Sequence, residues 1–105
     1  MIQAEFLTQS GELCGCRLSG HAGFADYGED IVCASVTSAL QLTANGITEI
    51  IKAPAQVSVL ENEISVVLKA PVSPCARTFL QALKLHLEVL AQEYEGTIQI
   101  KVSEV

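Results

Sequence analysis

Twice along the chain, a predicted β-hairpin is followed by a predicted helix, and this order is the strongest constraint on the fold. Each hairpin consists of two apolar-rich runs with a short polar turn between them: residues 2–8 and 13–18, then residues 57–60 and 64–68. Two such runs joined by a polar turn are typical of antiparallel strand pairs. The chain is therefore expected to build its sheet from hairpins.

The helices and a last strand complete the order. The first helix, roughly residues 30–51, has apolar side chains at helical spacing and Asp30 as a favourable N-cap. The second starts at Ser73–Pro74, an N-cap followed by proline at the first helical position, and ends before Gly96. Residues 97–102 alternate apolar and polar types, which predicts a half-buried strand. The order ββαββαβ predicts an α+β fold with mainly antiparallel pairing, in one sheet or more, packed on two helices.

The first predicted helix has few side chains that require water. Between Ile31 and Thr48 it carries no charge, and its less apolar side is made of Ala, Ser, Thr and Gln. We expect burial on more than one side, either between two sheets or at a subunit interface. The segment is about long enough to span a membrane, but its polar residues predict that it does not.

Length and composition favour one packed domain, residues 1–105. Half of the residues are hydrophobic and 17% are charged, which excludes intrinsic disorder. The net charge of −6 disfavours direct binding to nucleic acid or to anionic membranes and favours a basic peptide. The N-terminus has no signal-peptide pattern, so a cytoplasmic location is expected.

An aperiodic, glycine-containing loop is predicted for residues 20–29, between His21 and Cys33. If Asp30 caps the helix, Cys33 lies in the first turn, where free N–H groups favour a thiolate. His21 could fold back beside the thiol, and a Cys–His pair can carry out nucleophilic acyl transfer. The alternative is that Cys33 is a small packing residue and His21 a surface residue.

Two short motifs in this segment resemble a known family. Gly20-His21-Ala22, followed by Gly28-x-Asp30-Ile31-Val32-Cys33-Ala34, is similar to the signature of Prp, the bacterial ribosomal-processing cysteine proteases. The resemblance implies a cytoplasmic endopeptidase that removes the N-terminal extension of large-subunit ribosomal protein twenty-seven. It implies that Cys33 is the nucleophile and His21 the general base, and it suggests a homodimer. We expect that the reaction needs no cofactor. The resemblance also places motif residues at Gly20, Gly28 and Asp30.

Other residues of the segment have two interpretations each. Asp30 either caps the helix or orients His21. Thr37, one turn after Cys33, either helps to orient the site or bonds back to the helix backbone. The loop residues Gly23, Phe24, Asp26, Tyr27 and Gly28 are candidates for contact with substrate, although the aromatic ones could simply pack and the acids could be solvated.

The remaining cysteines do not form a recognisable metal site. Cys14 and Cys16 share one face of a predicted strand and Cys75 opens the second helix, so we expect all three to be small packing residues and predict no metal. His86 is expected on a surface or at an interface. Besides the protease, two functions remain open: a peptide-binding module in ribosome assembly that cuts no bond, and a redox or metal protein that uses the other thiols.

Overall fold

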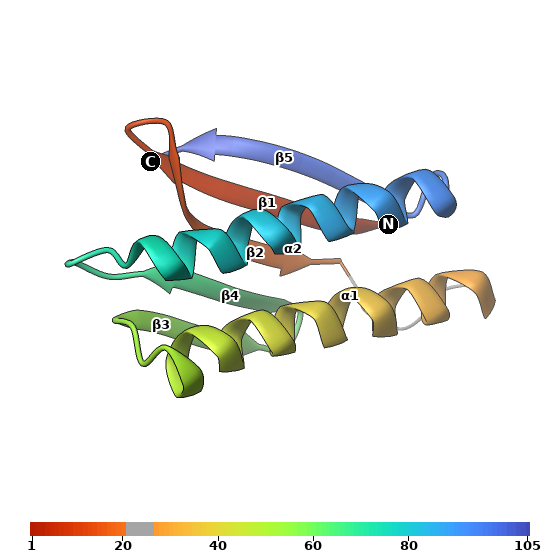
Figure 1. The fold of residues 1–105 in the computed structure, drawn as a ribbon. Helices are drawn as coiled ribbons and strands as arrows, with labels where there is room; N and C mark the ends of the chain where they lie inside the picture. Colours follow the sequence, from red (N-terminus) through yellow and green to blue (C-terminus); the bar gives the residue numbers. More distant parts are fainter. Residues whose placement is uncertain (21–26) are drawn as a thin grey trace.

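The computed structural model of the chain describes residues 1–20 and 27–105, and in them two helices cover one face of a five-stranded sheet (Figure 1). The predicted order ββαββαβ is confirmed. The elements are β1 (Ile2–Gln9), β2 (Glu12–Ser19), α1 (Tyr27–Asn45), the π-helical turn η1 (Gly46–Ile50), β3 (Ala55–Leu60), β4 (Glu63–Leu68), α2 (Pro74–Glu93) and β5 (Ile98–Glu104).

The sheet has the strand order β3-β4-β2-β1-β5. The three pairings β3–β4, β4–β2 and β2–β1 are antiparallel, whereas β1 and β5 are parallel. The prediction of a mainly antiparallel sheet is therefore confirmed. The parallel pair forms because α2 crosses the sheet between β4 and β5, and such a crossover lets two strands run in the same direction.

The first hairpin turns at Ser10 and Gly11, whose φ angles are 54° and 79°. Two consecutive residues with positive φ give the turn whose twist matches that of paired strands. Leu7 pairs with Gly15 and Thr8 with Leu13, so Cys14 is an extra residue in a β-bulge.

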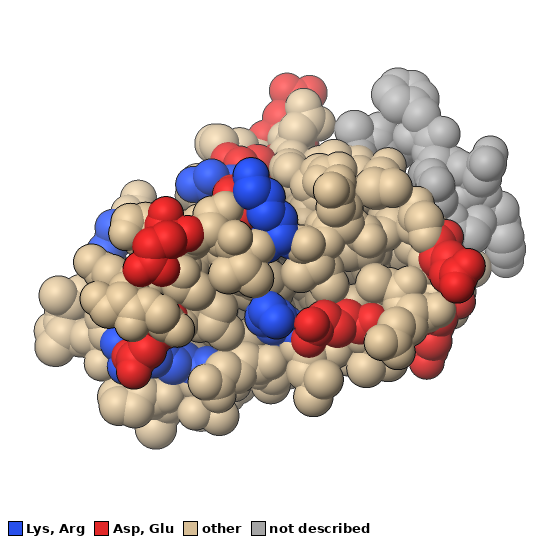
Figure 2. Space-filling model, turned by 90° about the horizontal axis from the view of Figure 1, so that it is seen from above, with Lys and Arg blue, Asp and Glu red and all other residues tan. Residues whose placement is uncertain are grey.

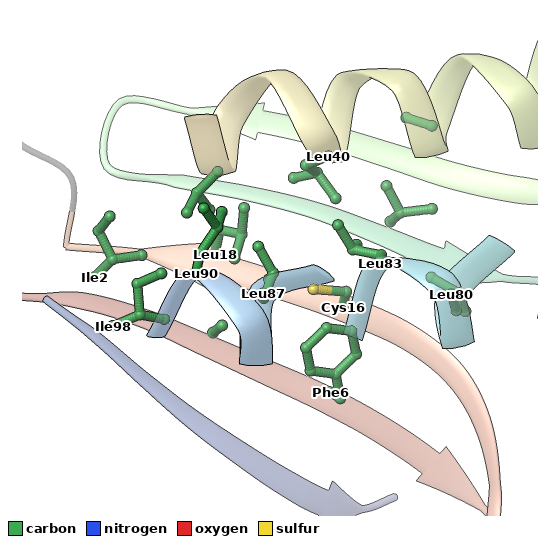
Figure 3. Close-up of a cluster of buried hydrophobic side chains, with 14 of the residues drawn as sticks. Ile2, Phe6, Cys16, Leu18, Leu40, Leu80, Leu83, Leu87, Leu90 and Ile98 are labelled. Atoms are coloured by element: carbon green, nitrogen blue, oxygen red, sulfur yellow. The ribbon is translucent and has the colours of Figure 1, made fainter. Parts of the chain in front are cut away.

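The hydrophobic core lies between the sheet and the two helices, which run side by side in opposite directions (Figures 1 and 3). It includes Phe6 and Cys16 from the sheet, Leu40 from α1, and Leu83 and Leu87 from α2. The second helix starts as predicted, because the Ser73 hydroxyl accepts a hydrogen bond from the Ala76 N–H (3.3 Å) ahead of Pro74.

The first helix starts three residues earlier than the sequence predicts. It begins at Tyr27, so Tyr27, Gly28 and Glu29 belong to α1 and not to the loop, and Asp30 is the fourth helical residue and not the N-cap.

Within the chain, α1 buries one side. Val32, Val36 and Leu40 are at most 2% exposed, whereas Ile31 and Leu42 are 46% and 72% exposed. The described residues form one sheet, so the predicted position between two sheets is wrong for them, and the alternative of a subunit interface stays a prediction. By length and a mean hydropathy of 1.2 the stretch Ile31–Ile50 could span a membrane, but here it supplies core residues of a folded domain.

The opposite face of the sheet is polar. Arg17 lies between Glu5 (3.1 Å) and Glu63 (3.4 Å), and Lys101 lies 3.9 Å from Glu5. Exposed ion pairs of this kind contribute about 0–1 kcal/mol each. Their presence explains why the helices gather on the other, apolar face.

Candidate active site

Cys33 lies on α1 as its seventh residue, in the second helical turn. The expectation that Cys33 lies in the first turn is therefore wrong. Only the first four N–H groups of a helix lack helical partners. The expectation that free N–H groups at the position of Cys33 favour its thiolate is therefore wrong as well. Its side chain is half-buried and packs against the core cluster. Thr37 is half-buried one turn later on the same flank.

Neighbours on both sides hold this part of α1 in place. Val32 and Val36 are buried against the sheet, so the helix cannot rotate without exposing them. The Ser35 hydroxyl donates to the Ile31 carbonyl oxygen (3.0 Å), which satisfies it within the helix. Cys33 is thus a partly accessible thiol on a rigid element, which suits a nucleophile.

Gly20 has a backbone conformation that only glycine adopts without strain. Its φ is +82°, and a Cβ at this position would lie 2.6 Å from the Met1 carbonyl oxygen. This glycine therefore closes the end of β2 against the start of the chain, directly before His21. Its place in the predicted motif has a structural reason.

His21, the predicted general base, lies outside the described residues, as do the loop candidates Gly23, Phe24 and Asp26. Tyr27 and Gly28, the other two loop candidates, open α1 together with Asp30. The geometry of the Cys33–His21 pair and the role of Asp30 therefore stay predictions.

Two of the other thiols are unsuited to nucleophilic chemistry. Cys16 is fully buried beside Phe6 in the core (Figure 3), and burial raises the pKa of its thiol to about 12. Cys14 is also buried, and the pKa of its thiol is raised by burial and then by the nearby Glu104 carboxylate. Both are packing residues, as predicted.

Cys75 differs from the prediction, because it is exposed. As the second residue of α2 it follows the Ser73 cap and Pro74, and the buried stripe of that helix begins only at Ala76. Across residues 1–20 and 27–105, no three His, Cys, Asp or Glu side chains lie close enough to hold a metal ion.

A groove of about 780 Å³ lies between α1 and α2 on the outer surface. Ser38 and Leu42 of α1 and Phe79, Ala82 and His86 of α2 are among its lining residues. His86 is exposed, in agreement with its predicted surface or interface position. Cys33 is not among the described residues that line the groove, whereas the next two residues of α1, Ala34 and Ser35, are.

The sequence analysis missed Glu104. Its carboxylate accepts hydrogen bonds from the Thr8 hydroxyl and from the Ser10 N–H (2.7 Å), so it joins the last strand to the first hairpin. Nothing in the local sequence could have revealed this, because the partners are more than 90 positions apart.

Figure 2 shows acidic and basic side chains interspersed on the face it presents, with uncharged areas between them.

Several solved structures are similar to the chain over nearly its whole length. SMU.848 from Streptococcus mutans is 25% identical, with a TM-score of 0.88, and the match covers 100% of this chain and 96% of that one. The ribosomal processing protease Prp from S. aureus, with a substrate peptide, is 21% identical, with a TM-score of 0.90 and coverage of 98% and 100%. The same protease with a covalently linked product peptide is 22% identical, with a TM-score of 0.85 and the same coverage. Among curated proteins, none matches the sequence.

The family comparison defines the class of protein. The family described as cysteine protease Prp matches residues 1–99, which is nearly the whole chain. The chain is therefore a cysteine protease. Within that class it belongs to the Prp family, and the resemblance inferred from its two motifs is confirmed.

Proposed function

We propose that the chain is a cytoplasmic endopeptidase that removes the N-terminal extension of large-subunit ribosomal protein twenty-seven. The observation that carries the proposal is the family match over residues 1–99. The similar S. aureus protein, an essential ribosomal processing protease, has been solved in complex with a substrate peptide and with a covalently linked product peptide. A covalent product is the chemistry expected of a cysteine nucleophile.

Cys33 is the thiol that best fits the nucleophile. Cys14 and Cys16 are buried and their thiol pKa values are raised, so neither can readily form a thiolate at neutral pH. Cys75 is exposed at the start of α2, away from the two sequence motifs. Cys33 lies within the second motif and is partly accessible on α1.

In the proposed reaction, His21 takes the proton of the Cys33 thiol, and the sulfur attacks the carbonyl carbon of the scissile bond. The C–N bond then breaks, and the imidazolium gives its proton to the leaving amine of the mature ribosomal protein. A water molecule attacks the thioester while His21 takes its proton. The extension leaves as a carboxylic acid, and the thiol is restored.

The test is incubation of the purified chain with extended ribosomal protein twenty-seven, followed by measurement of product mass. We expect cleavage by the unmodified chain and none by Cys33→Ala or His21→Ala, because nucleophile and base act as one unit. Cys33→Ser should be nearly inactive, because a hydroxyl ionises far less readily than a thiol. Wild-type turnover by Cys33→Ala would refute the assignment.

We also propose that the chain is a homodimer whose subunits meet along the groove between α1 and α2. Leu42 is 72% exposed there, beside the small residues Ala34 and Ser38. Such a face lets a helix of a second copy approach closely, and an exposed apolar stripe on α1 is otherwise unfavourable.

Sedimentation velocity can test this interface. Leu42→Glu should convert a dimer to monomers, because it would bury a charge in the interface. Leu85→Glu is the matched control, because Leu85 is 63% exposed on α2 but does not line the groove. Equal sedimentation of both variants and the unmodified chain would contradict the proposed interface.

A further inference from the structure

The two edges of the sheet differ in how they are protected. β3 is one edge strand, and within the described part of the chain its only partner is β4. Its sequence, Ala-Gln-Val-Ser-Val-Leu, has no charged residue and no proline, whereas the opposite edge strand, β5, carries Lys101 and Glu104. Charges and prolines are the usual protection of an edge strand against pairing with another chain. The β3 edge lacks this protection.

The hydrogen-bond register shows which residues of β3 face outward. Leu60 and Glu63 pair next to the two-residue turn, and the Lys69 N–H donates to the Pro54 carbonyl oxygen (2.9 Å). Because bonded and non-bonded pairs alternate in an antiparallel ladder, residues 54, 56, 58 and 60 bond to β4. Ala55, Val57 and Val59 therefore direct their N–H and C=O groups to the free edge.

The exposed side chains belong to the same residues. Val57 and Val59 are 41% and 71% exposed, and they lie opposite Val66 and Ile64 on the face that the helices cover. The edge thus offers outward-directed backbone groups and exposed apolar side chains at the same two residues, Val57 and Val59. An added strand would use both.

This edge lies on the same half of the molecule as α1, the helix that carries Cys33. Figure 1 shows α1 along β3 and β4, and α2 along β2 and β1. β3 follows directly after η1 and runs back along α1, toward the end of the helix where Cys33 lies (Figure 1). A chain paired with β3 is therefore directed toward the candidate nucleophile.

We propose that an extended segment of the substrate pairs with β3 as a sixth strand, which leads the scissile bond to Cys33. The proposal rests on the proposed protease function and names the surface that holds the peptide. Main-chain hydrogen bonds to Val57 and Val59 would supply affinity, and the two valine side chains would contact alternate substrate residues.

A peptide fits this edge better than a second copy of the chain does. β3 has six residues, about 20 Å in length, of which three direct backbone groups outward. A stable dimer interface buries about 1,200–2,000 Å² in total, more than two such strands can cover. A transient peptide complex needs far less contact.

The first test is Val59→Pro, assayed with a synthetic peptide that spans the extension and cleavage junction of ribosomal protein twenty-seven. Proline removes an outward N–H but no bond of the β3–β4 ladder. We expect KM to rise about tenfold, the effect of losing a hydrogen bond together with its close contacts, with kcat within twofold. An unchanged KM in a folded variant would overturn the proposal.

Val102→Pro is the matched control. The Ile2 N–H donates to Thr97 and the Val105 N–H to Thr8, so odd-numbered residues of β5 bond to β1 and the Val102 N–H faces outward. Val102 is 52% exposed on the other edge strand. We expect wild-type KM for this variant. An equal rise in both variants would mean a general effect of proline and would overturn the proposal.

A second measurement does not depend on the folding of the two proline variants. Single backbone N-methyl groups are placed along the peptide, and binding to the Cys33→Ala protein is followed by fluorescence anisotropy. Pairing with a strand predicts that methylation weakens binding at every second residue, because alternate N–H groups face β3. If N-methylation weakens binding equally at every residue of the peptide, the proposal is overturned. If the unmodified chain cuts no peptide but this alternation is found, the protease function fails and the β3 site stands.

Discussion

A Cβ atom on Gly20 would lie 2.6 Å from the carbonyl oxygen of Met1, so the end of β2 packs against the start of the chain too closely for a side chain at this position. The φ of +82° at Gly20 adds a second reason for glycine there. Together they determine the direction in which the chain leaves β2, immediately before the proposed base His21.

We therefore predict that Gly20→Ala lowers the free energy of unfolding by about 2 kcal/mol, from the left-handed backbone and the clash with a carbonyl. Gly11→Ala is the control, because Gly11 has a φ of +79° but no atom within 4 Å of its Cβ position. Its loss should be about 1 kcal/mol. Urea denaturation measures both, and equal losses would contradict the role of the Met1 contact.

Chemical labelling separates reactivity from exposure among the four thiols. Cys75 is the most exposed, whereas Cys33 is half-buried and is the proposed partner of His21. In a brief iodoacetamide pulse at neutral pH we predict that Cys33 is modified first, because the thiolate is the reactive form. Cys16, buried and with its pKa raised to about 12, should be last. Peptide mapping gives the order, and first labelling at Cys75 would count against an activated Cys33.

The Glu104 carboxylate should make the free energy of unfolding depend on pH in the acidic range. The Thr8 hydroxyl, followed by backbone N–H groups at Ser10 and Gly11, holds the pKa of this carboxyl below its ordinary value of 4.5. A carboxyl group whose pKa is lower in the folded state stabilises the fold at any pH above its pKa in the unfolded state. This stabilisation is lost as the pH falls through the pKa of the folded state. We predict that Glu104→Gln is less stable than the unmodified chain at pH 7, and that the difference narrows below about pH 4.5.

A double-mutant cycle with Thr8→Val tests the same contact. If the Glu104 carboxylate acts mainly through the Thr8 hydroxyl, the two substitutions together should cost less than the sum of their separate effects. Chemical denaturation at several pH values provides both measurements. A constant gap between Glu104→Gln and the unmodified chain from pH 7 to pH 3 would show that the carboxylate is not held as described.

The Cys16 thiol should make the free energy of unfolding depend on pH in the alkaline range. In the unfolded chain its thiol ionises near pH 9, whereas burial keeps it protonated up to about pH 12 in the folded chain. Between these values the unfolded state gains about 1.4 kcal/mol per pH unit from this thiol. Cys16→Ala should be less stable than the unmodified chain at pH 7, because it leaves a cavity, and should lose less stability above pH 9. Parallel stability curves for the two proteins would contradict this.

The order of elements and the family were accessible from the sequence by itself. Hairpin turns and helix starts are local: Gly11 between two apolar runs and Ser73-Pro74 before an apolar stripe predict the elements that form. The motifs around Gly20 and Cys33 are likewise read within fifteen residues. The start of α1 at Tyr27 was missed because one further helical turn costs little free energy, so local signals determine such boundaries only weakly.

Only the tertiary structure decided which distant residues meet. It placed β5 parallel to β1, brought Glu104 to Thr8, buried Cys16 while leaving Cys75 exposed, and left the uncharged strand β3 at an edge. None of these follows from local pattern, because a strand's neighbours and a side chain's burial depend on how the whole sheet is assembled. The residue types set which contacts are favourable, and the packing of helices on one face of the sheet selected which of them form.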